Sequence, residues 1–392
     1  MVVCAVNSVR WIDRPFPGFL LWENLLVPAV SDTDWTGHEA GVPYLSRLQT
    51  MNGHPVASAA EVYRFAAHEP EGTPVRYTFV RAHDDRPIEL TVPTMRLLVS
   101  DYFWTFGNYL LTGAALVFLG FVVYLMRPDS PAARAMLVFA AIWGLFLVTS
   151  ADIFGPAWFR PLCRVLEALG PVAGVHLALA FPVERPILAR RPLFLPGLYA
   201  FGLTVGIVDN VLFNQWFAAV HAIVLLNSGG VMLGGLVLLG SLLEAYYRPP
   251  SPAVRQRTKI AVLGCVFAFV VPVVGFLVRV LLGVNVPLNY ATLSVAIFPA
   301  AIGIENFTGG MGSAAFVAYL SLLCNARFTA TQYALLSALA AVPQRLLSAY
   351  GGVLAEQLGW VPFFLVSTVA ALPGLLLLVV LMRRYPLPKP AT

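Results

Sequence analysis

Runs of about twenty apolar residues, separated by short polar loops, follow one another from Tyr102 to the end of the chain. A helix of that length, rising about 1.5 Å per residue, crosses the roughly 30 Å hydrocarbon core of a bilayer. The pattern predicts membrane spans near residues 103–125, 132–152, 161–182, 193–213, 216–245 and 259–283, and a seventh that begins near 287. This part of the chain is predicted to be a polytopic helical bundle.

Residues 17–98 have a different pattern, in which apolar and polar positions alternate as in β-strands. The segment "PVRYTFVRAHDDRPIELTVPTM" predicts two strands joined by a polar turn from His83 to Pro87. A small α+β domain is therefore expected ahead of the membrane helices.

A turn and a helix are predicted within that domain. Asn52 and Gly53 form a dipeptide that accepts positive φ and therefore favours a tight turn. Ser58 can cap a helix that runs to about His68, and Glu61, three residues after Ser58, completes a capping box.

Composition supports a division of the chain into one part that lies in water and one part that lies in lipid. Of the 392 residues, 58% are hydrophobic and only 11% are charged, far below the roughly 25% charged residues of an average soluble protein. Residues 1–101 carry a net charge of −4, from eight arginines and twelve acidic residues, whereas residues 102–392 carry +9. The basic residues of the second part lie in short loops, where they act as topology signals, so nucleic acid is not expected as a partner.

The loop charges predict orientation. Nine basic residues lie in the loops after the first, third and fifth spans, against only Arg160 and Arg164 in the loops after the second, fourth and sixth. The positive-inside rule therefore places the first set of loops in the cytoplasm and the acidic head outside. No secretory signal or leading membrane helix is apparent before the head, and the scattered cysteines are expected to be packing residues.

The order of strand, "NGHPV", helix, "PEGTPV" and two further strands resembles the second half of a PDZ domain. That resemblance implies a groove that receives an extended peptide by strand addition. Asn52, Gly53, His54 and Glu61 are the ligand-binding candidates of the head. The alternative is a small β-rich head that has no groove.

Up to residue 303 the chain resembles the input region of bacterial sensor proteins of the histidine-kinase type. The likeness is carried by "RWIDRPFPGFLLWEN", "RPDSPAARA", "HLALAFPVERP" and "AIFPAAIG", and it implies a PDZ-like head followed by seven membrane helices. Such sensors usually have a membrane helix before the head and an output domain after the last helix, and neither is apparent here.

Ionisable residues inside spans are functional candidates because they are costly in lipid. His176 is the strongest, in the inner half of the third span, and the alternative is a histidine that bridges two helices. Glu167 and Asp209 are expected to reach the interface by snorkelling, as are three further residues. These are His221, Glu244 and Arg279.

After residue 303 the sequence resembles the last three helices of AmpG-type muropeptide permeases of the major facilitator superfamily. The likeness rests on "ENFTGGMGSAAFVAYLSLLCN", "FTATQYALLSAL" and "LAEQLGW". It implies that several residues contribute to a pathway for a sugar-peptide substrate. They are Glu305, Asn306, Gly309, Gly310, Gln332 and Arg345. These transporters have twelve helices, so transport by this chain alone is not expected.

Charge also favours nine spans over ten. A single crossing from Val286 to Cys324 leaves Arg383, Arg384 and Lys389 in the cytoplasm, whereas two crossings place them outside. Five segments are expected: a lead (1–16), the PDZ-like head (17–98), sensor-type helices (102–303), AmpG-like helices (304–385) and a cytoplasmic tail (386–392).

The hypothesis that follows is a multi-pass protein of the bacterial cytoplasmic (inner) membrane, a sensor-type input module fused to part of a muropeptide permease. The alternatives are an AmpG-family muropeptide transporter or its remnant, and a gene fusion without a joint function. Lipid and a peptide or peptidoglycan fragment are the expected partners, with a homo-oligomer left open. No zinc-protease, hydrolase, phosphate-loop or kinase motif occurs, so no enzyme activity and no cofactor or metal is expected.

Overall fold

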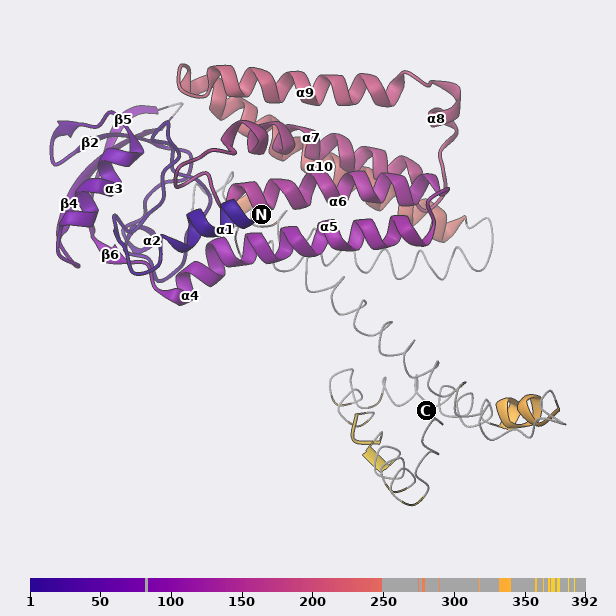
Figure 1. The fold of residues 1–392 in the computed structure, drawn as a ribbon. Helices are drawn as coiled ribbons and strands as arrows, with labels where there is room; N and C mark the ends of the chain where they lie inside the picture. Colours follow the sequence, from indigo (N-terminus) through magenta and orange to yellow (C-terminus); the bar gives the residue numbers. More distant parts are fainter. Residues whose placement is uncertain are drawn as a thin grey trace. The chain divides into compact units, whose positions relative to one another are not determined.

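The computed structural model describes residues 1–81 and 84–248, and beyond them only scattered positions and the helical stretch 331–339. The chain divides into two compact units, Met1–Gly303 and Ile304–Thr392. The first unit contains a head with a small sheet and a bundle of long helices (Figure 1).

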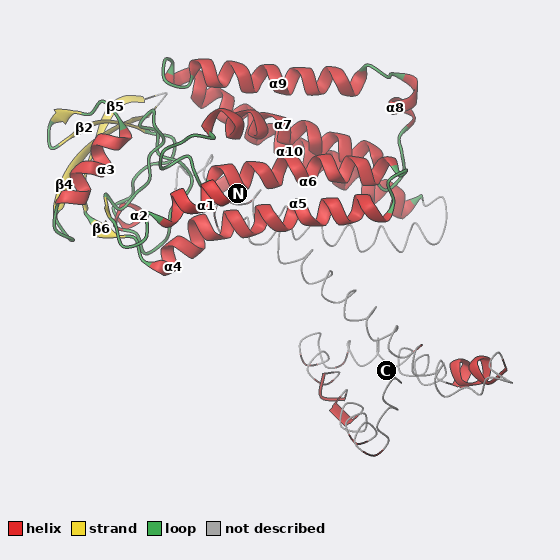
Figure 2. Ribbon diagram, viewed as in Figure 1, coloured by secondary structure: helices red, strands yellow, loops and turns green. Residues whose placement is uncertain are grey.

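The head is built on a four-stranded antiparallel sheet with the order β3-β2-β4-β5 (Figure 2). Its strands are β2 (Arg47–Met51), β3 (His54–Pro55), β4 (Pro74–Arg81) and β5 (Asp84–Pro93). The predicted hairpin exists, but the predicted turn was too long, because Asp84 to Pro87 already belong to β5. A separate pair joins β1 (Pro15–Phe16) to β6 (Met95–Arg96).

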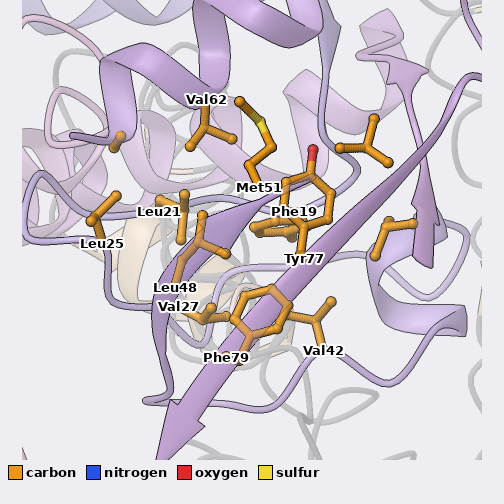
Figure 3. Close-up of a cluster of buried hydrophobic side chains, with 13 residues drawn as sticks. Phe19, Leu21, Leu25, Val27, Val42, Leu48, Met51, Val62, Tyr77 and Phe79 are labelled. Carbon is orange, nitrogen blue, oxygen red and sulfur yellow. The ribbon is translucent and has the colours of Figure 1, made fainter. Parts of the chain in front are cut away.

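Alternation along β4 builds the head's core. Val75, Tyr77 and Phe79 are fully buried, as expected when every second side chain of a strand points to one face. They pack with Phe19 and with Val62 of helix α3 (Ala59–His68), so the sheet and the helix share one apolar layer (Figure 3). Two shorter helices complete the head: α1 (Val2–Val9) and α2 (Thr36–Glu39).

The predicted turn and helix start are confirmed, with one correction. Asn52 and Gly53 have φ values of 52° and 82° between β2 and β3, and Ser58 is the N-cap of α3. The expected capping box is not formed, because the Glu61 carboxylate accepts the backbone N–H of Ala57, at 2.9 Å, instead of that of Ser58.

Five helices of the described part are long and apolar enough to cross a membrane. The first runs from Val99 to Met126 and comprises α4 (Val99–Tyr102), a π-helical turn η1 (Phe103–Gly107) and α5 (Asn108–Met126). The others are α6 (Pro131–Ser150), α7 (Arg160–Ala180), α9 (Phe194–Leu212) and α10 (Phe217–Tyr247). They agree with the first five predicted spans to within a few residues; the predicted sixth and later spans lie outside the described residues.

Small residues allow these helices to approach closely. A Cβ at Gly113 of α5 would lie 2.5 Å from the carbonyl oxygen of Gly144 on α6. A Cβ at Gly206 of α9 would lie 2.7 Å from the Cα of Val165 on α7. Such contacts provide much of the packing in lipid, where the hydrophobic effect does not drive helices together. Helix α7 packs against α6, α9 and α10 and is the centre of the described bundle.

The head is packed onto the bundle. One apolar cluster combines Trp11 and Trp35 of the head with Phe106 and Val148 at the near ends of the first two membrane helices and with Phe154 in the turn after the second. Beside it, the Asn7 amide of α1 donates to the Asp152 carboxylate, at 2.7 Å. Head and helices therefore share a core.

Candidate functional site

An ionic cluster lies at the head end of α7 and α9. The Arg164 guanidinium on α7 contacts the carboxylates of Asp209 on α9 and Glu167 on α7, each with an N–O distance of 2.5 Å. The Arg164 side chain is 4% exposed and that of Asp209 is fully buried. Because charge is costly to remove from water unless it is paired, these groups are held by one another.

A segment of the head covers this cluster. Trp22 places its ring 5.1 Å from the Arg164 guanidinium, and Glu23 forms an ion pair with Arg160 at 2.8 Å. Phe213, just after α9, lies within cation–π distance of both arginines. The Asn24 amide donates to the carbonyl of Phe213 at 2.9 Å. Residues 22–24 are named the clamp from here on, because they join the head to α7 and α9.

The cluster keeps hydrogen-bonding capacity. Five of its buried polar atoms have no hydrogen-bond partner within the part of the chain that the structure describes. They are the donors Trp22 Nε1, Arg160 Nη1 and Arg164 Nη2 and the acceptors Asp209 Oδ1 and Asn210 Oδ1. Since buried polar groups are rarely left unpaired, donors and acceptors gathered in this way suit a guest that can both donate and accept, such as water.

The prediction that Glu167 and Asp209 snorkel to the interface was wrong. Both carboxylates instead turn inward to Arg164, which had been interpreted only as a loop charge. One sequence signal could have found the pair: Arg164 lies near the start of one span and Asp209 near the end of another that runs the opposite way. These two opposite charges are then expected at a similar depth in the membrane.

His176 bridges two helices. Its Nδ1 lies 3.0 Å from the hydroxyl of Tyr199, and the two rings meet edge to face across α7 and α9. This contact is the one expected of a histidine that bridges two helices. Ligand binding at His176 stays a prediction.

A second arginine–carboxylate pair lies at the other end of α7, away from the head. Arg185 contacts Glu244 of α10 at 2.8 Å and donates to the Ser241 hydroxyl at 3.1 Å. The Arg185 and Glu244 side chains are 29% and 56% exposed. Next to them, α8 (Pro186–Arg190) and the ends of α7 and α10 line a pocket of about 430 Å³.

The ligand-binding candidates of the head lie on the exposed turn between β2 and β3 and near the start of α3. The side-chain oxygen of Asn52 accepts the backbone N–H of Arg76 at 3.0 Å and so supports the turn. Gly53 and His54 are exposed beside it, and Glu61 supports the start of α3. The structure therefore groups Asn52, Gly53 and His54 in one turn.

The edges of β2 are occupied by the protein's own backbone. Leu48 donates to Leu25 and Val27 donates to Ser46, each at 3.0 Å, on the edge that β3 continues, and β4 pairs with the opposite edge. A peptide cannot add to β2 without displacing residues 25–27 or β3.

Tyr63 of α3 closes the adjacent surface. Its hydroxyl accepts the N–H of Leu21 at 2.6 Å and donates to the carbonyl of the same residue at 3.0 Å. Burial raises the pKa of the Tyr63 hydroxyl, so it keeps the proton that it donates. Helix α3 is thereby tied to the segment that it faces.

The cysteine prediction is confirmed for two residues, Cys4 and Cys163, which are free and buried. Of the transport candidates, Gln332 belongs to the helical stretch 331–339. The others, Glu305, Asn306, Gly309, Gly310 and Arg345, lie outside the described residues.

These features define a class: a helical membrane protein with five candidate spans in the described part and a small head packed onto them. Comparison with known proteins adds a narrower likeness. The chain is 53% identical over 81 residues to the anhydromuropeptide permease of Escherichia coli K12, a match covering 21% of this chain and 16% of the permease. No family model matches the chain.

Two rickettsial proteins show the same likeness. Identity is 42% over 94 residues to the putative transporter AmpG 4 of Rickettsia conorii, covering 24% of this chain and 23% of that protein. It is 33% over 118 residues to the putative transporter AmpG 1 of Rickettsia felis, covering 30% and 25%. The chain thus matches between 16% and 25% of the length of these relatives. They are transporters by name, which supports a membrane transporter-like protein over an enzyme.

Proposed function

We propose that the chain is a muropeptide-transporter-like protein of the bacterial cytoplasmic membrane. The observation that carries this proposal is the 53% identity over 81 residues to a permease of anhydromuropeptides. Residues 304–385, which carry the sequence resemblance, supply the AmpG-like helices, and the tail after them lies in the cytoplasm. In this proposal, Glu305, Asn306 and the Gly309-Gly310 pair line the pathway, with Gln332 and Arg345 contributing.

Uptake in cells tests the proposal. Cells that lack their own permease and express this chain are given radiolabelled anhydromuropeptide, and the label accumulated inside is measured. The twelve-helix architecture of the permeases predicts no uptake by this chain alone, whereas the transport proposal predicts uptake that Glu305→Gln abolishes, because it removes the charged group proposed for the pathway. Glu89→Gln makes the same change at an exposed position of β5 and is expected to leave uptake unchanged.

A control separates a protein that does not transport from a full-length protein that is not made. Immunoblots of washed membranes, which detect an epitope tag at the C-terminus of the chain, report whether the full-length chain is present. Sequencing single long DNA molecules across codons 295–310 asks whether both parts share one gene. Full-length chain in the membrane without uptake would refute transport, whereas two separate genes would show that the joined sequence is a misassembly without a joint function.

A second function is favoured by the clamp. Residues 1–303 can serve as an extracytoplasmic head with a membrane input region, organised as the sensor resemblance implies. The clamp supports this idea, because a shift of Trp22 or Glu23 changes the surroundings of Arg164 and Arg160 directly. In this proposal a peptide or peptidoglycan fragment binds at the turn Asn52–His54 and beside Glu61, and the paired edges of β2 are not used.

Ligand binding to the full-length chain tests this second function. The protein in lipid nanodiscs is titrated with peptidoglycan fragments, and the change in intrinsic tryptophan fluorescence is recorded, since Trp22 lies in the clamp. His54→Ala is expected to weaken the response, whereas His68→Ala, at another exposed histidine of the head, is not. A response that is equal in both variants, or absent in the parent protein, would remove the sensor proposal without touching the transport proposal.

A further inference from the structure

We propose that the pocket beside Arg185 binds the headgroup of a phospholipid that carries both a phosphate and a primary ammonium group, as phosphatidylethanolamine does. This inference goes beyond the proposed transport function and does not depend on it. It rests on the pocket's place in the bundle, its lining and the charges at its mouth.

The pocket lies where a lipid headgroup meets the protein. It is formed by the ends of α7 and α10 and by α8, at the end of the bundle away from the head. Tyr246 and Tyr247 follow on α10, and tyrosines are enriched at membrane–water interfaces. Its volume of about 430 Å³ falls within the roughly 300–1,000 Å³ of small-ligand pockets.

The lining is apolar and the mouth is charged. Leu179, Ile187 and Val237 supply apolar walls that suit the glycerol and upper acyl carbons of a lipid. Arg185 and Glu244 stand at the mouth, with the hydroxyl of Ser241 beside them. Among the described residues that line it, the site offers one cation, one carboxylate and one neutral hydrogen-bonding group, and Arg248 lies near enough to act on the same carboxylate.

Charge complementarity selects among headgroups. A phosphate can accept from Arg185 and Ser241, but a purely anionic lipid also meets the Glu244 carboxylate and is repelled by it. A primary ammonium donates hydrogen bonds to that carboxylate, which a trimethylammonium cannot do. The pair Arg185–Glu244 thus matches a headgroup that presents phosphate and ammonium together, with each charge beside its opposite.

Native mass spectrometry of the full-length protein, purified in detergent, tests the proposal. The protein is titrated with short-chain phosphatidylethanolamine, phosphatidylcholine or phosphatidylglycerol, and the apparent affinity of the first bound lipid is measured. Phosphatidylethanolamine is expected to bind about tenfold more tightly than phosphatidylcholine, as for one hydrogen bond between charged groups.

Matched variants sharpen the result. Glu244→Gln is expected to reduce affinity for phosphatidylethanolamine about tenfold and to raise that for phosphatidylglycerol, and Arg185→Gln to weaken both. Glu184→Gln and Arg190→Gln make the same changes at exposed neighbours outside the lining and are expected to have no effect. Equal binding of phosphatidylethanolamine and phosphatidylcholine, tighter binding of phosphatidylglycerol, or indifference to Glu244→Gln would overturn the proposal.

Discussion

The two ends of α7 carry the same kind of contact in two different settings. At the head end Arg164 meets Asp209, and at the far end Arg185 meets Glu244, with N–O distances of 2.5 and 2.8 Å. The first pair is 0–4% exposed, whereas the second is 29–56% exposed. Contact distance alone therefore says little about what an ion pair does; burial separates a structural ionic cluster from an open, exchangeable site.

The difference follows from what covers each pair. The clamp, Phe213 and the neighbouring turns of α7 and α9 shield Arg164 from solvent, so its charge depends on its carboxylates. Arg185 borders a pocket and can exchange Glu244 for water or a headgroup at little cost. The predictions below separate these two situations, from the largest expected effect to the smallest.

Asp209→Ala is expected to have the largest effect on stability. Removal of one partner leaves the buried Arg164 charge with Glu167 alone, and the free energy of unfolding should fall by about 3–5 kcal/mol. Chemical denaturation in detergent micelles measures the loss. Asp129→Ala, at an exposed loop position, should change the midpoint little; a comparable loss in both variants would contradict the special status of Asp209.

Gly206→Ala tests whether close approach of α7 and α9 is needed to hold the buried pair together. The new Cβ would lie 2.7 Å from the Cα of Val165, so the helices must separate, at a cost of about 1–3 kcal/mol. Gly197→Ala on the same helix meets no atom within 4 Å and should be neutral or slightly stabilising. Equal melting temperatures for the two variants would exclude the tight contact.

Tyr199→Phe removes the hydroxyl that His176 contacts near the end of α7 and the start of α9, away from the head. The expected loss is about 0.5–1.5 kcal/mol, as for a single neutral hydrogen bond. Tyr247→Phe, at a 76% exposed position, is the matched control. If the first variant is as stable as the second, the His176–Tyr199 bridge contributes nothing to folding.

Glu244→Gln is expected to have the smallest effect on the free energy of unfolding in lipid-free micelles, because an exposed ion pair contributes little to stability. Any loss should disappear in high salt, because an exposed pair is screened. Thermal melts at low and high sodium chloride measure both. A large, salt-independent loss would show that the far pair behaves like the buried one.

Hydrophobic run length predicted the spans because each helix must be apolar over the thickness of the bilayer. For the same reason α6 and α9 begin and end within two residues of the predicted limits. The start of the first helix was placed late, since Val99 to Tyr102 are joined to the span through a π-helical turn with no distinct sequence pattern. Orientation and the number of later spans remain predictions.

The ionic cluster could not be read from local pattern. Arg164 and Asp209 are 45 residues apart, and their pairing depends on how α7 and α9 pack. The closed edge of β2 was also not anticipated, because the backbone hydrogen bonds that join Leu25 to Leu48 and Val27 to Ser46, about twenty residues along the chain, leave no periodic signal. By contrast, Asn52 and Gly53 were correctly placed in a turn, since the backbone conformation there is a local property.

A double-mutant cycle on each pair, Arg164→Met with Asp209→Leu and Arg185→Met with Glu244→Leu, compares the two ends most directly. Unfolding free energies of both singles and the double are measured for each cycle in the same micelles. The structure predicts a coupling of about 3 kcal/mol or more for the buried pair and a much smaller coupling for the exposed pair. Equal coupling energies at the two ends would contradict it.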